Sequence, residues 1–162
     1  MPFPLIDVLS VRHYLAQNGI FLNASVSLVD IGNINYVYCL EDPKQGTFYL
    51  KYYGLAPRRT NSAIDKIGYE PTRFLNERDA LLLLHRVLDP LLTSALPKIV
   101  HTDLEARVLI MTDIANHKPI LRELLLSDPS LAAQALPFAA RFLAQQHAST
   151  LGCKDLVQHD AF

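Results

Sequence analysis

The fold is decided by residues 25–51, whose sequence is SVSLVDIGNINYVYCLEDPKQGTFYLK. Three runs rich in β-branched and aromatic residues, at 25–31, 36–40 and 47–51, predict three β-strands. A short loop of glycine and asparagine joins the first two runs, and the polar segment 41–46 is typical of a hairpin turn. The three strands should therefore pair as an antiparallel meander.

The rest of the chain adds helices and two more strands. Apolar residues at helical spacing predict an opening helix that ends at Asn18-Gly19. The other predicted elements are a loop at 53–68, a long helix at 72–88, strands at 97–101 and 106–111, and helices at 119–126 and 128–148, the last interrupted at Pro137. Five strands and one long helix predict an α+β fold with a five-stranded antiparallel sheet. We place a domain boundary after residue 114, so the predicted domains are 1–114 and 115–162.

Composition narrows the classes of function. The chain has 162 residues, half of them hydrophobic, and a formal net charge of -1, so it lacks the basic surface of proteins that bind nucleic acids or acidic membranes. No apolar run is long enough to cross a bilayer and no basic segment precedes the first apolar residues, which favours a cytoplasmic protein.

Cys39 and Cys153 match no metal or redox spacing and are predicted to be free thiols. The histidines show no ligand spacing either, so we expect no zinc site.

A carboxylate lies on the apolar stripe of the predicted long helix, because Glu77 recurs at helical spacing with Phe74 and Leu81. An unpaired charge in a partly buried place is strongly unfavourable, so a cation should face Glu77. Lys51, in the otherwise apolar third strand, is the candidate. A lysine held by a glutamate can present its ammonium group to the α- and β-phosphates of a nucleotide. The alternative is a surface lysine on an edge strand and a glutamate at the rim of an amphipathic helix.

Two further segments are candidates for nucleotide contacts. The loop Gly32-Asn33-Ile34-Asn35 can turn sharply and direct backbone N–H groups towards phosphate, although an ordinary hairpin loop fits the same pattern. Met111-Thr112-Asp113-Ile114 follows an apolar strand and precedes the helical region, where backbone groups could meet an adenine edge. A plain connector between two domains is the alternative there. Arg58 and Arg59 could contact phosphate or an anionic substrate, although exposed arginines in loops are usually solvated.

The order of these parts resembles the aminoglycoside phosphotransferase and choline kinase group, and within it most closely the methylthioribose kinases. The segments that carry the likeness are DIGNINYVY (30–38), LK (50–51), RFLNERDAL (73–81), LPKIV (96–100), VLIMTDIANH (108–117) and ILREL (120–124). The likeness covers nearly the whole chain, but the chain covers less than half of a complete member.

The resemblance implies a protein-kinase-like N-lobe followed by the first helices of a truncated C-lobe. A complete member would transfer the γ-phosphoryl group of ATP to a substrate hydroxyl with the help of magnesium. In that scheme Lys51 positions the phosphates and Glu77 holds Lys51. The loop 32–35 would cover the phosphates, and residues 111–114 would carry the adenine. The acceptor substrate stays open.

The chain departs from the family pattern in two places. Gly32 runs straight into Asn33, without the further small and acidic residues usual in members, so the loop should grip phosphate less well. The His-Gly-Asp catalytic loop and the later metal-binding aspartate are missing, and we interpret His159-Asp160 as part of the tail. We therefore expect the chain alone to be inactive.

The rival hypothesis is a non-catalytic binding or interaction module, either a degenerate kinase lobe or a truncated product that pairs with a second chain. Phe138 and Leu143, with other apolar residues among alanines, give the segment 137–148 more apolar surface than a small lobe should cover. We therefore expect a homodimer or a second chain that supplies the missing lobe.

Overall fold

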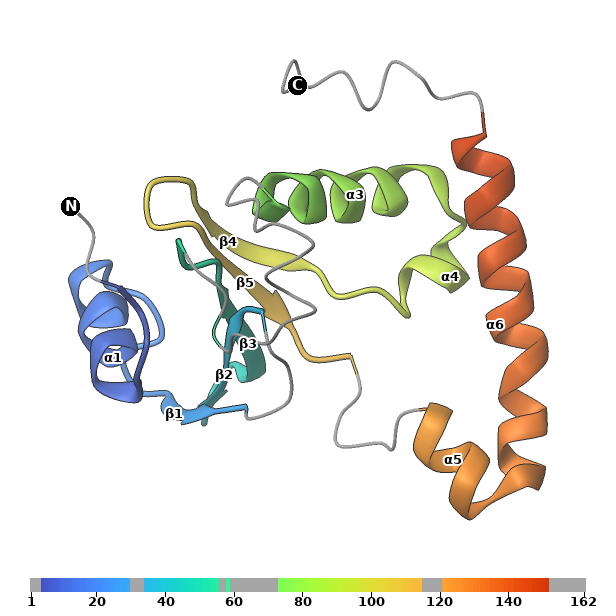
Figure 1. The fold of residues 1–162 in the computed structure, drawn as a ribbon, viewed down its shortest axis with the longest axis horizontal. Coiled ribbons are helices and arrows are strands. Elements are labelled where there is room, and N and C mark those ends of the chain that lie inside the picture. Colours follow the sequence, from blue (N-terminus) through green and yellow to red (C-terminus); the bar gives the residue numbers. More distant parts are fainter. Residues whose placement is uncertain (1–3, 30–33, 56–57, 59–72, 115–120, 152–162) are drawn as a thin grey trace. The chain divides into compact units, whose positions relative to one another are not determined.

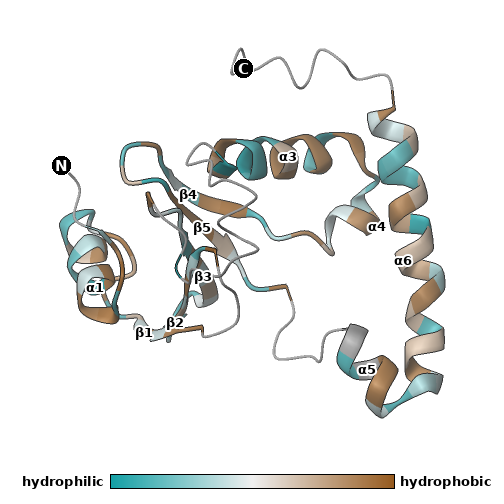
Figure 2. Ribbon diagram, in the orientation of Figure 1, coloured by the Kyte–Doolittle hydropathy of each residue, from teal (hydrophilic) through white to brown (hydrophobic). Residues whose placement is uncertain are grey.

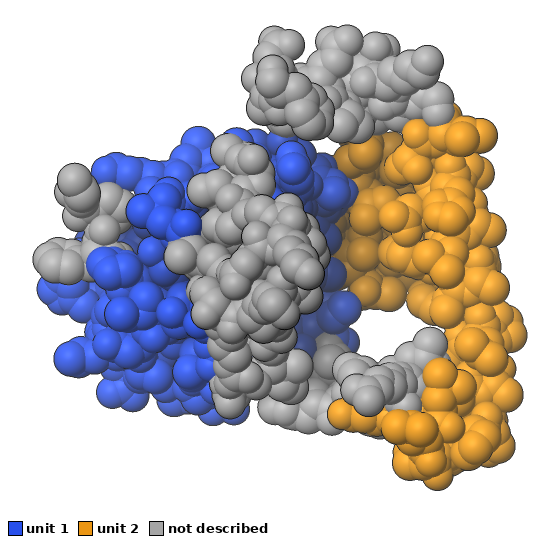
Figure 3. Space-filling view, viewed as in Figure 1, with its two compact units in different colours: residues 1–81, 97–114 blue, residues 82–96, 115–162 orange. Residues whose placement is uncertain are grey.

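The structure is a computed structural model that describes residues 4–29, 34–55, 58, 73–114 and 121–151. The chain forms two compact units (Figure 3). The first consists of residues 1–81 and 97–114, and the second of residues 82–96 and 115–162. The sequence-based division into domains 1–114 and 115–162 stays a prediction.

The first unit is built around one antiparallel sheet (Figure 1). Its strands are β1 (Ser25–Leu28), β2 (Tyr36–Asp42), β3 (Gly46–Tyr52), β4 (Ile99–Asp103) and β5 (Val108–Thr112). The order across the sheet is β1-β2-β3-β5-β4, and every neighbouring pair is antiparallel. The predicted α+β class and five-stranded antiparallel sheet are therefore confirmed. Strand β3 lies in the middle, with a hydrogen-bonded neighbour on each side.

The turn between β2 and β3 is tighter than the predicted segment 41–46. Asp42 and Gly46 already face each other as a strand pair. One carboxylate oxygen of the buried Asp42 accepts hydrogen bonds from the amides of Lys44 and Gln45, each at 2.9 Å. Gly46 closes the turn with a φ of +94°, a backbone region that residues with a Cβ rarely adopt. The side chain and the glycine together shorten the turn to three residues.

Helix α1 (Val8–Gln17) packs on one face of the sheet. Asp7 caps its first turn, since its carboxylate accepts from the amide of Ser10 at 2.7 Å while the Ser10 hydroxyl accepts from the amide of Asp7. The helix ends at Asn18, and Gly19 follows with a φ of +66°, which confirms the predicted stop. The main core lies between this helix and the sheet and contains Val11, Tyr14, Leu15, Val26, Tyr38, Leu40, Phe48, Leu50, Tyr52, Val108 and Ile110.

The long helix, α3 (Arg73–Val87), starts in the first unit and continues into the second. A short helix that the sequence did not predict, α4 (Pro90–Thr93), follows at once. Asp89 caps it by accepting from the amide of Leu92 at 2.9 Å, and Pro90 occupies its first turn. The Asp89-Pro90 pair therefore starts a new helix as well as separating it from α3, because an Asp-Pro pair suits both an N-cap and the first helical position.

The second unit also contains α5 (Leu121–Ser127) and α6 (Pro129–Thr150). The predicted interruption at Pro137 is wrong, because α6 runs through this residue without a break. A proline inside a helix removes one backbone hydrogen bond and strains the preceding turn. The alanine, leucine and glutamine residues around it favour the helix, and the Asp128 cap accepts from the amide of Leu131 at 3.0 Å.

Hydrophobic residues recur along α6 (Figure 2), and several of its large apolar side chains are exposed. They are Leu131, Leu136, Phe138 and Leu143. Ala132 is buried, so the helix also has a packed side. Among the helices in the described residues, none combines the length and apolar character needed to span a membrane.

Candidate functional site

Lys51 and Glu77 form an ion pair, as the sequence predicts. The Lys51 ammonium lies 2.7 Å from Oε1 and 2.6 Å from Oε2 of Glu77, so one cation engages both carboxylate oxygens. The side chains are 22% and 35% exposed, respectively. At this intermediate exposure the two charges are partly shielded from water.

Strand β3 determines where Lys51 points. Lys51 pairs with Val37 on β2 and Leu109 on β5, so the alternative of a lysine on an edge strand is wrong. Side chains alternate along a strand, and Leu50 belongs to the core under α1. Lys51 therefore lies on the opposite face of the sheet. There its Nζ lies 5.2 Å from the centre of the Tyr53 ring, a distance that allows a cation–π contact.

A small apolar cluster holds Glu77 opposite Lys51. Phe74, one turn earlier on α3, is buried against Tyr53 and Leu109, and Leu75 packs against the same cluster. The rings of Phe74 and Tyr53 lie 5.8 Å apart. Leu109 is the strand partner of Lys51, so the cluster fixes the start of α3 beside the strand residue that Glu77 must reach.

Beyond Lys51, the same sheet face continues with three residues in register. Tyr49 pairs with Cys39 on β2 and with Met111 on β5. Met111 is buried, whereas Cys39 and Tyr49 are half-buried. Burial raises the pKa of both Cys39 and Tyr49, so the thiol and phenol stay protonated and neutral at neutral pH. This part of the face offers one aromatic ring and two sulfur atoms, and the negative charge of Asp113 lies close enough to raise the pKa of Cys39 and Tyr49 further.

The segment from Met111 to Ile114 is more tightly tied to the sheet than a plain connector. Thr112 ends β5, and its amide donates to the carbonyl of Lys98 at 2.9 Å. The amide of Asp113 donates to the carbonyl of Thr47 at 3.1 Å. These two N–H groups are therefore engaged inside the sheet and do not offer donors to a ligand. The exposed Ile114 follows them.

The predicted phosphate loop is only partly visible, because Gly32 and Asn33 lie outside the described residues. Ile34 and Asn35 are described, and both are half-buried. Arg58 connects the flanks of this loop. Its amide donates to the carbonyl of Ile34 at 3.0 Å, and its guanidinium donates to the carbonyl of Val29 at 3.2 Å.

The Arg58 guanidinium also lies 5.8 Å from the centre of the Tyr36 ring. Arg58 is thus half-buried and bonded to the chain, and not a solvated loop arginine as its sequence context suggests. The only sequence signal for this role is its position after β3, which is too general to identify the contact.

A second polar cluster, missed from the sequence, joins α1 to β4. The hydroxyl of the buried Tyr14 donates to Oδ2 of Asp103 at 3.0 Å and lies 3.0 Å from Nε2 of His101. The other oxygen of Asp103 accepts from the amide of Ala106 at 2.8 Å. Within the described residues, no three His, Cys, Asp or Glu side chains come together in a group that could hold a metal ion.

Comparison with known proteins finds neither a family model nor a curated protein that matches this sequence. The candidate site therefore rests on the geometry of Lys51, Glu77 and the strand face beside them.

Proposed function

We propose that the chain is the ATP-binding lobe of a small-molecule kinase of the methylthioribose kinase or aminoglycoside phosphotransferase type, acting in the cytoplasm. The observation that carries the proposal is the contact between Lys51 and both carboxylate oxygens of Glu77. In phosphoryl transfer by protein kinases, a strand lysine held by a helix glutamate orients the α- and β-phosphates of ATP. The central position of Lys51 in an antiparallel sheet agrees with that role.

The pair suits phosphate binding for a physical reason. Glu77 accepts two of the possible hydrogen bonds of the Lys51 ammonium, which holds the lysine in one orientation before any ligand arrives. The third donor direction is then available to a phosphate oxygen, and hydrogen bonds between charged groups are stronger than neutral ones. Because the orientation is already set, less side-chain entropy is lost when the phosphate binds.

The face beside Lys51 suits a purine. Tyr49 and Met111 are paired across β3 and β5, and because Met111 is buried while Tyr49 is half-buried, the Tyr49 ring supplies most of the accessible surface. A planar base could stack on such a surface while its phosphates reach the ammonium group of Lys51. Cys39, on the other side of Tyr49, extends this surface.

The proposed chemistry is incomplete in this chain. The resemblance implies magnesium, but the described residues contain no group of three potential ligands that fits the ion. The sequence also holds no His-Gly-Asp motif that would supply a catalytic aspartate. The chain's own contribution, in this proposal, is to bind and orient the nucleotide, with transfer to a hydroxyl completed by the second lobe of a whole enzyme.

Calorimetric titration of ATP into the purified chain tests the proposal. Lys51→Met keeps the length of the side chain but removes its charge, and it should weaken ATP binding roughly 10- to 100-fold, the equivalent of one hydrogen bond between charged groups. Lys98→Met is the matched control, because Lys98 is exposed and only its backbone groups are bonded to Thr112. ATP binding that survives Lys51→Met unchanged would contradict the proposal.

The second candidate function is a non-catalytic module that pairs with another copy or another chain. The exposed apolar side chains of α6 favour it, because their burial against a partner would contribute roughly 25 cal/mol for each Å² of apolar surface. Sedimentation of the wild type and of Leu143→Glu, with Leu9→Glu on α1 as the exposed-leucine control, tests it. Association that only Leu143→Glu abolishes, in a chain that does not bind ATP, would favour this function.

A further inference from the structure

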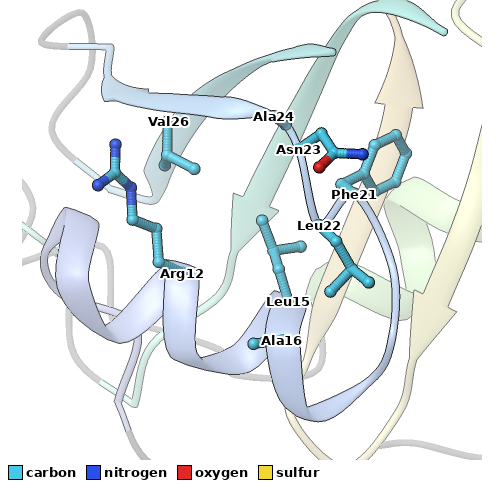
Figure 4. A pocket seen from close by; sticks show the side chains of 8 residues that line it. All are labelled: Arg12, Leu15, Ala16, Phe21, Leu22, Asn23, Ala24 and Val26. Carbon is cyan, nitrogen blue, oxygen red and sulfur yellow. The ribbon is translucent and has the colours of Figure 1, made fainter. Parts of the chain in front are cut away.

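A hollow of about 250 Å³ lies between α1 and the segment that leads into β1 (Figure 4). Leu15 and Val26 form its base, and both belong to the core between α1 and the sheet. That core contains Leu50, whereas Lys51 points to the other side of the sheet. The hollow is therefore separate from the candidate nucleotide site.

The walls of the hollow are held in place by the backbone. After the end of α1 the amide of Ile20 donates to the carbonyl of Leu15 at 3.1 Å, and the amide of Ala24 donates to the carbonyl of Phe21 at 3.0 Å. Phe21 has a φ of +48°, which is unfavourable for a bulky residue. Its ring packs on Phe48 with centroids 4.7 Å apart, which holds it in this conformation. The hollow is thus formed before any ligand binds.

The lining combines apolar side chains with two polar ones, the guanidinium of Arg12 and the amide of Asn23. In Figure 4, Leu15 lies between Arg12 on one side of the hollow and Leu22 on the other. Leu22 is 66% exposed, so its side chain has apolar surface left to cover. Arg12 is exposed and forms no ion pair with any carboxylate in the described part of the chain. A hollow that combines apolar side chains with an exposed guanidinium at its edge is complementary to an apolar molecule that carries one carboxylate.

We infer that this hollow binds a small aliphatic monocarboxylate, with the carboxylate on Arg12 and the hydrocarbon chain between Leu15 and Leu22. The volume is below the range of about 300–1,000 Å³ for pockets that hold drug-sized ligands, which limits the ligand to a short chain. The guanidinium offers paired donors to both carboxylate oxygens, whereas an uncharged alcohol of the same length would keep only the apolar contacts.

An NMR titration of the full chain with octanoate, hexanoate and butyrate tests the inference. Shifts should be confined to amides around the hollow, and affinity should rise about fourfold for each added methylene group that becomes buried. Octanol should bind about fivefold more weakly than octanoate, which is the upper end of what one exposed ion pair contributes.

Three variants make the test decisive. Arg12→Met should bring octanoate down to the affinity of octanol, and Arg86→Met, which removes an exposed arginine of α3, should leave octanoate binding unchanged. Ala16→Leu, at an exposed helical position that lines the hollow, should reduce binding of both ligands by filling the space. Octanoate shifts that are absent, that map outside the hollow, or that persist equally in Arg12→Met would overturn the inference.

Discussion

Tyr14→Phe is the sharpest test of how the first unit is held together. The substitution removes one hydroxyl and leaves the ring of a buried side chain in place. That hydroxyl donates to Asp103 at 3.0 Å and lies at the same distance from His101, so it joins α1 to β4. The perturbation therefore removes a polar contact between two elements without opening a cavity larger than one oxygen atom.

The expected loss of stability follows from the groups to which the Tyr14 hydroxyl is bonded. A hydrogen bond to a charged group contributes roughly 1.5–3 kcal/mol. Asp103 is half-buried and keeps its second contact, to the amide of Ala106, so water can partly replace the lost donor. We therefore expect Tyr14→Phe to lower the free energy of unfolding by about 1–2 kcal/mol, at the lower end of that range.

The pH dependence supplies an independent readout. Burial, together with the negative charge of Asp103, raises the pKa of Tyr14 above its usual value of 10.0. Below pH 10 the phenol is protonated in both folded and unfolded chains, so its contribution is complete. At higher pH the unfolded chain loses this proton first, which favours unfolding of the wild type. The stability difference between wild type and Tyr14→Phe should therefore shrink above about pH 10.

Urea denaturation at a series of pH values measures both effects. Tyr36→Phe is the control, because Tyr36 is half-buried and its hydroxyl makes no hydrogen bond within the described residues. A Tyr14→Phe variant whose stability stays within about 0.5 kcal/mol of the wild type, as for an ordinary surface substitution, would refute the reasoning. A difference that grows above pH 10 would refute the assigned proton donor.

Three further predictions concern the hairpin turn, α6 and catalysis. Asp42→Ala should lower the free energy of unfolding by about 1–3 kcal/mol, because two turn amides lose their acceptor; an unchanged thermal midpoint would contradict this. Pro137→Ala should raise the stability of α6 by about 1–3 kcal/mol and increase the helical circular dichroism signal, because it restores a backbone donor. The purified chain with ATP should not phosphorylate methylthioribose, aminoglycosides or choline, and product that disappears in Lys51→Ala would show the opposite.

The sheet and the ion pair could be predicted because their signals are local. The strand runs are short and rich in β-branched and aromatic residues, and Glu77 stands out as a charge on an apolar helical stripe. A charge in such a position needs a partner, and few cations lie in apolar strands. Lys51 was therefore identifiable without knowing how the chain folds.

The remaining contacts join residues that local patterns cannot connect. Tyr14 and Asp103 are 89 positions apart, and nothing in either segment marks the other as its partner. Arg58 has the sequence context of a solvated arginine, and its contact to Val29 depends on how the chain returns after β3. The predicted interruption at Pro137 was wrong for a different reason. The tendency of proline to break a helix was outweighed by the helix-favouring residues around it.

The engaged amides at the end of β5 bear on base selectivity. Adenine and guanine differ in the hydrogen-bonding groups along their edges, whereas both present a similar aromatic face. The N–H groups of Thr112 and Asp113 are occupied by carbonyls of the sheet, so neither of them can donate a hydrogen bond to the edge of a purine. In the proposed ATP-binding lobe, the choice between ATP and GTP would therefore not depend on the N–H groups of these two residues.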